Sequence, residues 1–230
     1  MAGKRKKKVV FRKDLFHELG LFKKNFSYVD VVVNKEGVSF MSLDPSCISL
    51  MVVKYSVDDF LDFEVEGEDK FCIDVSDVVM LSKLTNVLFV KEGDRITIES
   101  DNLTFKFNVM EFENACKNID KIDKEIGGDC VAITEPSKFY SGLKHVSTVS
   151  EIVEFVVKGK EFFIRGCSGD REVWVKVCSA DLSDRVIKLN LNYVPKIDDI
   201  FEIYLNEGKP VKFQTIDKKV VCYIAPIFES

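Results

Sequence analysis

The sequence lacks the signatures of several large protein classes. Its 230 residues include seven cysteines, an odd number, and no two of them form a CxxC pair. That pattern suits a reducing compartment and argues against a disulfide framework or a zinc ribbon. No apolar run approaches the roughly 20 residues that a membrane helix needs, and no signal peptide opens the chain. We therefore expect a soluble intracellular protein that does not bind a membrane.

Motifs for catalysis are also missing. The sequence has no GxSxG, HExxH or Walker loop, and its only histidines are His17 and His145. Either histidine could in principle activate Cys47 or Cys167 for nucleophilic chemistry, but lone histidines on helices are usually structural or surface residues. The acidic run DKIDKE alternates with lysine, which is typical of a solvated linker rather than a metal site. We expect no enzymatic activity, no cofactor and no bound metal.

The chain is rich in core-forming residues and uneven in charge. Hydrophobic residues make up 46% of it, with 19 phenylalanines against 5 prolines, enough for a sizeable core. Residues 1–24 hold nine Lys or Arg against Asp14 and Glu18, which leaves 24 basic and 36 acidic groups in the other 206 residues. Nucleic acid repels an acidic protein unless the basic groups gather on one surface. The placement of the basic residues is therefore the central question about function.

Short β-rich stretches separated by Gly, Asn and Asp dominate the chain. The stretch EGVSFMSLDPSCISL, residues 36–50, predicts two short strands joined by a turn. Gly93-Asp94 and Asp101-Asn102 are typical of hairpin turns, because these residues tolerate positive φ. Helical spacing is confined to four short segments, which are 15–22, 75–84, 136–146 and 189–197, the last cut short by Pro195.

The chain repeats its own order of elements. Residues 29–55 and 153–177 both run apolar strand, Lys/Gly turn, apolar strand, small polar turn, apolar strand. Residues 111–129 are polar and charged, and they end near a Gly-Gly pair. We therefore predict an α+β fold of two similar halves, with an N-terminal domain at 1–110, a linker at 111–129 and a C-terminal domain at 130–230.

Two segments resemble the DNA sliding clamps of the proliferating-cell-nuclear-antigen (PCNA) family. The pattern Gly-Val-x-x-x-Ser-x-Asp-x-Ser-x-Val-Ser-Leu is matched at Gly37, Val38, Ser42, Asp44, Ser46, Ser49 and Leu50, with Ile48 replacing the valine. The ending VCYIAPIFES resembles the family's C-terminus through Tyr223, Ile224, Ala225 and Pro226. The resemblance implies that the two segments lie side by side, and that each half folds as β-sheets outside two short helices. It also implies that three subunits close a pseudo-sixfold ring around duplex DNA.

In the family the helices line the DNA channel, where basic side chains touch phosphates without reading bases. The residues expected to face DNA, helix by helix, are Arg12, Lys13, Lys23 and Lys24, then Lys83, then Lys138, Lys144 and His145, then Lys188 and Lys196. Ordinary solvated helix faces carry lysine too, so that alternative stays open. The cluster KRKKK at residues 4–8 departs from the family pattern. It could be a nuclear import signal, an extra DNA contact or a disordered solubilising tail.

The resemblance also implies an outer pocket into which partner proteins insert a short apolar peptide plug. Carried over residue by residue, its lining would be Leu43, Cys47, Met110, Phe112, Tyr223, Ala225 and Pro226. Leu43 and Tyr223 could instead be plain core residues. Subunits would pair edge strands near residues 86–91 and 160–177.

The resemblance thus implies a DNA polymerase processivity factor without catalysis of its own, which stays on DNA because leaving requires opening a subunit interface. The expected partners are duplex DNA, bound without sequence preference, peptides of replication and repair polymerases, nucleases and ligases, a clamp loader, and two further copies of the chain. The expected location is at replicating DNA, in the nucleus if the host is a eukaryote. Two alternatives share the fold: a subunit of a heterotrimeric checkpoint-type clamp, and a scaffold that does not bind DNA.

Overall fold

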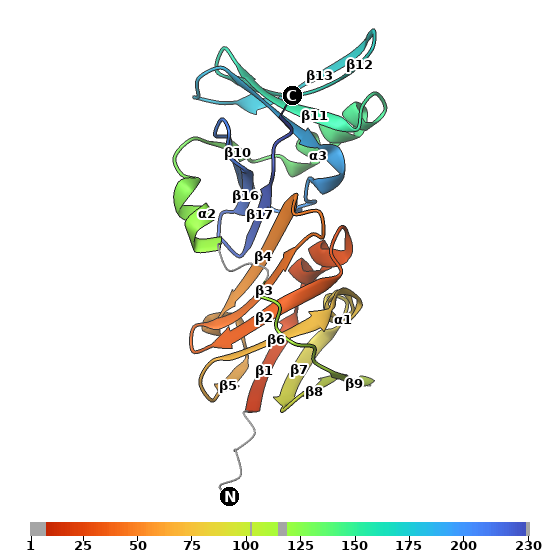
Figure 1. The fold of residues 1–230 in the computed structure, drawn as a ribbon, viewed down its shortest axis with the longest axis vertical. Coiled ribbons are helices and arrows are strands. Elements are labelled where there is room, and N and C mark those ends of the chain that lie inside the picture. Colours follow the sequence, from red (N-terminus) through yellow and green to blue (C-terminus); the bar gives the residue numbers. More distant parts are fainter. Residues whose placement is uncertain (1–7, 102, 115–118, 229–230) are drawn as a thin grey trace, which may run out of the picture. The chain divides into compact units, whose positions relative to one another are not determined.

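The computed structural model describes residues 8–101, 103–114 and 119–228 (Figure 1). The chain divides into two compact units. Unit 1 comprises Met1–Pro45 and Met51–Lys117, and unit 2 comprises Ser46–Leu50 and Asn118–Ser230. The predicted domain boundaries at 110 and 130 remain a proposal. Within the described residues, no helix has both the length and the apolar character needed to cross a bilayer.

Unit 1 is built from short antiparallel strands and three helical segments. Its elements are β1 (Lys8–Leu15), the 3-10 helix η1 (His17–Lys23), β2 (Tyr28–Asn34), β3 (Gly37–Leu43), β4 (Ser49–Ser56), the 3-10 helix η2 (Val57–Asp59), β5 (Asp62–Val65), β6 (Asp69–Asp74), α1 (Val75–Leu81), β7 (Thr85–Glu92), β8 (Arg95–Ser100) and β9 (Leu103–Asn108). One sheet has the order β5-β1-β7-β8-β9, and a second runs β4-β3-β2-β6. The first two residues of β4 belong to unit 2.

Unit 2 repeats this plan. Its elements are α2 (Ile119–Glu125), β10 (Cys130–Ile133), α3 (Pro136–Ser147), β11 (Ile152–Lys158), β12 (Glu161–Ser168), β13 (Arg171–Ser179), β14 (Arg185–Asn190), the 3-10 helix η3 (Leu191–Tyr193), β15 (Phe201–Tyr204), β16 (Val211–Thr215) and β17 (Val220–Ile224). Its sheets run β13-β12-β11-β14 and β10-β15-β16-β17. The predicted α+β fold and the repeat are confirmed: residues 29–55 form β2-β3-β4, and residues 153–177 form β11-β12-β13.

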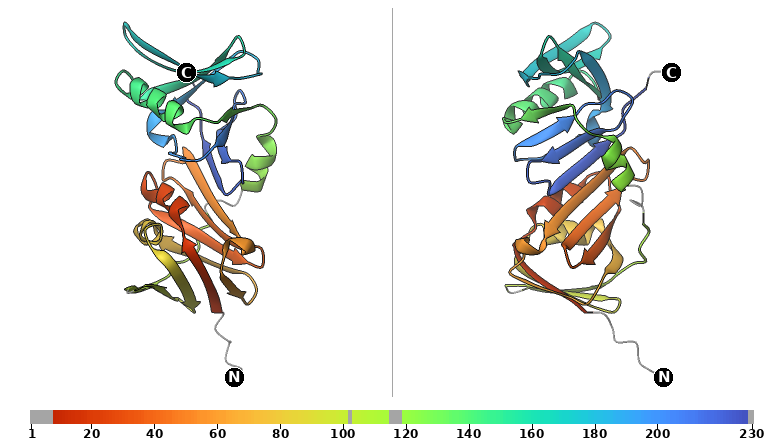
Figure 2. Two further views of the ribbon diagram at one scale, coloured as in Figure 1. Left: turned by 180° about the vertical axis from the view of Figure 1, so that it is seen from behind. Right: turned by 90° about the vertical axis from the view of Figure 1, so that its left-hand side faces the viewer.

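Aromatic and aliphatic side chains fill the core of each unit. In unit 1 the rings of Phe11 and Phe89 stack with centroids 4.3 Å apart, on neighbouring strands β1 and β7. In unit 2, α3 packs on β12 and β13 (Figure 2). The buried face of α3 includes Phe139 and Val146. Gly166 on β12 permits this approach, because a Cβ there would lie 2.5 Å from Val146 Cγ1. At this point a residue without a side chain on β12 faces a valine on α3, which lets the helix pack closely on the sheet.

Two of the four predicted helices are short 3-10 segments, namely η1 and η3. The expectation that Arg12 and Lys13 belong to the first helix is wrong, because β1 continues to Leu15 in register with β7. Lys188 likewise lies on β14, opposite Glu154 of β11, and not on the fourth helix. In both places cross-strand pairing extends the strand into a segment whose sequence alone resembles a helix end.

The predicted edge strands are partly wrong. Residues 86–91 lie in β7, which is paired on both sides, with β1 and with β8. The strand at that edge of the sheet is β9. Within residues 160–177, β12 is interior and β13 is the edge strand. A strand's own pattern reports which face is buried, whereas its position in the sheet depends on its neighbours.

Candidate functional site

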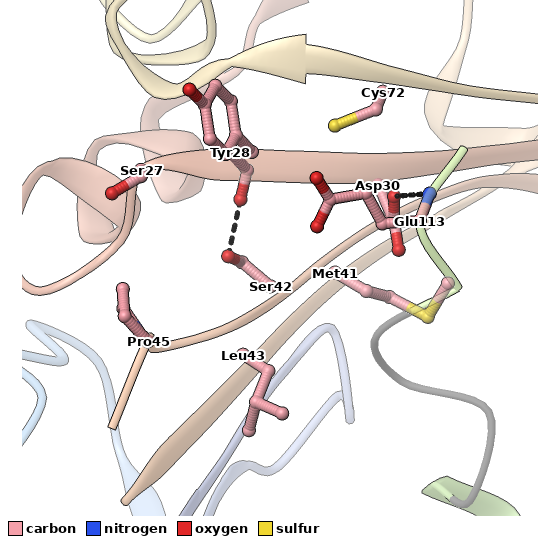
Figure 3. A pocket seen from close by; sticks show the side chains of 9 residues that line it. All are labelled: Ser27, Tyr28, Asp30, Met41, Ser42, Leu43, Pro45, Cys72 and Glu113. Atoms are coloured by element: carbon pink, nitrogen blue, oxygen red, sulfur yellow. Dashed lines mark hydrogen bonds between the residues drawn. The ribbon is translucent and has the colours of Figure 1, made fainter. Parts of the chain in front are cut away.

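A hollow of about 270 Å³ opens in unit 1 beside Leu43, one of the predicted docking residues. Its lining comes from β2, β3, β6 and the segment after β9 (Figure 3). The lining residues are Ser27, Tyr28, Asp30, Met41, Ser42, Leu43, Pro45, Cys72 and Glu113. Tyr28, Pro45 and Leu43 leave apolar surface exposed or half-exposed at the opening, so the hollow joins an apolar wall to acidic groups.

The alternation of β2 places Asp30 in this hollow. Val29 and Val31 are buried in the core, so Asp30 points to the opposite face of the sheet. On that face it lies opposite Met41 of β3 and Cys72 of β6. Met110 bridges to Cys72, and the chain then turns over the sheet, where the Glu113 N–H donates to Asp30 Oδ1 at 3.3 Å.

The hollow has an acidic character. Asp30 is only 4% exposed. Burial raises the pKa of the Cys72 thiol to about 12, and the nearby carboxylates of Asp30 and Glu113 add to the shift. No lysine or arginine is among the residues that line the hollow. Across the described part of the chain, no group of three or more His, Cys, Asp or Glu could hold a metal ion.

The end of the first resembling segment, Ser46–Leu50, lies beside the C-terminal segment within unit 2, as predicted. The Ala225 N–H donates to the Ile48 carbonyl at 2.8 Å, and Ser49 Oγ lies 3.7 Å from Cys222 Sγ. Cys47 is exposed at the turn, with φ of 57°. The C-terminal segment is thus fixed against the turn by main-chain bonding.

Helix α2 is anchored to the outer strands of unit 2. Tyr204, Lys212 and Tyr223 are neighbours across β15, β16 and β17. Lys212 Nζ lies 5.0 Å from the Tyr204 ring centroid and 6.0 Å from that of Tyr223. Lys212 and the Tyr223 hydroxyl each donate to Asp123 Oδ1 of α2 at 2.6 Å. The run DKIDKE thus forms a helix that is fixed at Asp123, while Lys121, Lys124 and Glu125 are exposed. The linker at 111–129 remains a proposal.

The predicted docking residues fall in both units. Leu43, Met110 and Phe112 belong to unit 1, and Cys47, Tyr223, Ala225 and Pro226 belong to unit 2. Met110 is 37% exposed next to Cys72, whereas Tyr223 is buried under Asp123. Sequence reasoning missed Tyr28, Asp30, Cys72 and Glu113. The available signal was a single acid inside the apolar run VDVVV.

Six of the predicted DNA-facing residues are exposed on or next to helices. Lys138, Lys144 and His145 lie on α3, away from its buried face. In unit 1, Lys23 and Lys24 lie at the end of η1, and Lys83 follows α1. The helices η1 and α1 pack against each other (Figure 1). Each unit thus carries basic side chains on its helical surface.

The other predicted DNA-facing residues are engaged within the protein or lie off the helices. Lys13 Nζ donates to the Asp59 carbonyl at 3.2 Å, and Lys188 Nζ lies 3.5 Å from Glu154. Lys196 is exposed, 3.9 Å from Asp198. Arg12 is half-buried on β1. Of the cluster KRKKK, only the last lysine falls within the described residues.

Comparison with known sequences finds distant relatives. No family model matches the chain. A DNA polymerase sliding clamp of Pyrococcus horikoshii is 25% identical over 157 residues, and that of Thermococcus fumicolans is 27% identical over the same length. Each match covers 65% of this chain and 61% of the relative. The sequence similarity therefore spans about three-fifths of these clamps.

Comparison with solved structures covers nearly the whole chain. A. fulgidus PCNA bound to the C-terminal region of FEN-1 has a TM-score of 0.77 at 15% identity, over 96% of this chain and 99% of that one. PCNA of Entamoeba histolytica also has a TM-score of 0.77, at 16% identity, over 98% of this chain and all of that one. A PCNA2–PCNA3 complex of Sulfolobus tokodaii gives a TM-score of 0.74. At these identities the likeness establishes the fold.

Proposed function

We propose that this chain, a divergent member of the PCNA family of DNA sliding clamps, is a DNA polymerase processivity factor that works without catalysis of its own. Three copies would form a ring around duplex DNA and tether replication and repair enzymes. The observation that carries the proposal is the agreement of fold along almost the full chain, at a TM-score of 0.77, with PCNA structures that are only 15–17% identical.

The helical surface of each unit supplies the chemistry that such a ring needs. The side chains of Lys138, Lys144 and His145 are exposed on α3 and are not part of the face that the helix buries. Lysine contacts to phosphate are sequence-blind, and each is weak at physiological salt. A closed ring converts such contacts into long residence, because the DNA leaves only when an interface opens. The expected location is replicating DNA, in the nucleus if the host is a eukaryote.

The solution mass tests whether the chain is a self-sufficient ring. We expect light scattering of the purified protein to give about three times the 26.2 kDa chain mass over a wide concentration range. A chain that stays monomeric at all concentrations would contradict the homotrimer. It would favour a subunit that assembles with other chains, as PCNA2 and PCNA3 of S. tokodaii do in their complex.

Peptide docking on the outer face is part of the same proposal. Leu43 is half-exposed at the end of β3, where a partner's apolar plug could bury it. We expect Leu43→Glu to weaken binding of an apolar polymerase- or nuclease-type peptide at least tenfold, because the plug would then bury an uncompensated charge. Isothermal titration calorimetry would measure the loss.

Leu61→Glu is the matched control, since Leu61 is 61% exposed in the same unit and lines no hollow described here. It should bind the peptide as the unchanged protein does. Equal affinities for Leu43→Glu and Leu61→Glu, with both proteins folded, would remove Leu43 from the docking site.

A further inference from the structure

Strand β5 forms one edge of the five-stranded sheet of unit 1, at the end opposite to β9 (Figure 1). On one side it pairs with β1, in register from Val65 to Asp62. The Leu61 N–H extends this pairing by donating to the Arg12 carbonyl at 2.8 Å. Within the described residues no strand pairs with the other side of β5. The main-chain groups on that side can therefore bond to an added strand.

One face of this edge strand leaves apolar surface uncovered. Phe63 lies opposite Phe11 of β1, which is buried in the core, so both side chains point to the core side of the sheet. Their ring centroids are 6.5 Å apart. Phe63 and Val65 are nevertheless only half-buried, and Leu61, just before the strand, is 61% exposed. A strand added at this edge would cover apolar surface that unit 1 leaves open.

The other face of the edge is acidic. Asp62 and Glu64 alternate with the apolar residues and are exposed, as is Glu66 just after the strand. Residues 57–69 contain seven Asp or Glu and no Lys, Arg or His. Among the described residues no ion pair includes these three acids, although Arg12 lies opposite Asp62 on β1. Charges of one sign along an edge repel most strands and select one of the opposite sign.

We propose that the open edge of β5 binds an extended segment of a partner protein in which basic and apolar residues alternate. Its basic side chains lie beside Asp62, Glu64 and Glu66. Its apolar side chains cover Phe63 and Leu61. A second copy of β5 does not fit, since it would bring two acidic rows together. The site lies within unit 1 and does not depend on the proposed function.

A short peptide tests the alternation. The probe is KVKFKVK, capped at both ends, and its matched control is KKKKVFV, which has the same residues in two blocks. We expect the probe to shift the amide NMR signals of β5 saturably and to slow hydrogen exchange along the strand. The control should bind at least tenfold more weakly, because its charges cannot gather on one face of a strand. Equal affinities would mean that the acids attract any cation, which would overturn the site.

Methylation of the peptide main chain tests the strand pairing itself. Two versions of the probe carry N-methyl groups, one at its lysines and the other at its apolar residues. In a β-strand the N–H groups of successive residues point to opposite edges. One version should therefore bind at least tenfold more weakly than the probe, and the other within about twofold of it. Equal affinities of the two versions would rule out main-chain pairing.

Variants of the protein locate the site. Glu64→Gln combined with Glu66→Gln should weaken binding of the probe about tenfold. The matched control combines Glu36→Gln with Glu99→Gln, two exposed acids elsewhere in unit 1, and should change the affinity less than twofold. Leu61→Ser should weaken binding about threefold to fivefold through lost apolar contact. Full affinity in the first variant would place the peptide elsewhere.

A shortened chain tests whether the occupant is a partner. Removing residues 2–7 takes away four of the five basic residues of KRKKK. The affinity for the probe should stay the same. A tenfold gain would mean that the chain's own basic cluster competes for this edge, and the assignment to a partner protein would then be wrong.

Discussion

Gly37→Ala is expected to lower the free energy of unfolding by about 3 kcal/mol or more, since a clash in a packed interior costs about 1–3 kcal/mol and strained backbone about as much again. A Cβ at this position would lie 2.0 Å from the Tyr55 carbonyl oxygen of β4, and the φ of Gly37 is +142°. The neighbour is backbone, so it cannot rotate away. The chain must either separate β3 from β4 or leave this conformation.

Displacing Tyr55 would affect more than one strand. Its ring packs edge-on against Phe16 at 5.2 Å and against Phe40 at 6.1 Å. Its hydroxyl donates to Glu18 at 2.7 Å, which ties β4 to η1. A shift of this backbone therefore reaches the helical surface that carries Lys23 and Lys24. Under the proposed function, weaker binding of duplex DNA should accompany the loss of stability.

Gly67→Ala is the control for the backbone conformation alone. Gly67 also has positive φ, +83°, but nothing lies within 4 Å of the Cβ it would gain. Its cost should be near 1 kcal/mol, from strain without collision. Chemical denaturation of both variants gives the comparison. If the two lose the same stability, the close approach of β3 and β4 at Gly37 is not what requires glycine there.

Local pattern predicted much of this fold. The turn between β3 and β4, the hairpin at Gly93-Asp94 and helix α3 follow from alternation, positive φ and a proline at the first helical turn. Helix α2 was missed although Ile119, Ile122 and Ile126 have helical spacing, because the intervening charges obscured it. Its anchor at Lys212 is 89 residues from Asp123 in sequence, so no local pattern shows it.

The candidate sites depend even more on tertiary structure. Asp30 is conspicuous in an apolar strand, but only the bridge at Met110 brings Glu113 over it. The basic residues show the same limit. The sequence identifies Lys13 and Lys188 as basic. In the structure, Lys13 donates a hydrogen bond to the Asp59 carbonyl, and Lys188 forms an ion pair with Glu154. The sequence shows how many charged side chains there are, but only the fold shows which of them point to solvent and which contact other groups of the protein.

Leu103→Glu and Trp174→Glu are each expected to convert the proposed three-chain ring to smaller species. Leu103 on edge strand β9 is 42% exposed, and Trp174 on edge strand β13 is 44% exposed. Within the described residues each of these strands is paired with a neighbouring strand on one side only, and apolar side chains lie beside the open edge, which suits pairing between copies. A glutamate at either edge would be buried without a partner, at a cost of several kcal/mol for each interface.

Mixing the two variants gives the sharpest result. In a ring, β9 of one subunit would meet β13 of the next, a head-to-tail contact. Leu103→Glu leaves β13 intact and Trp174→Glu leaves β9 intact, so each variant alone should scatter light as a single 26.2 kDa chain. The mixture still has one compatible pair of edges, and its mass should therefore rise to two chains and stop there.

Ile216→Glu, at a residue 56% exposed and outside every strand, should keep the full ring. Three-chain masses for both edge variants would mean that the subunits meet elsewhere.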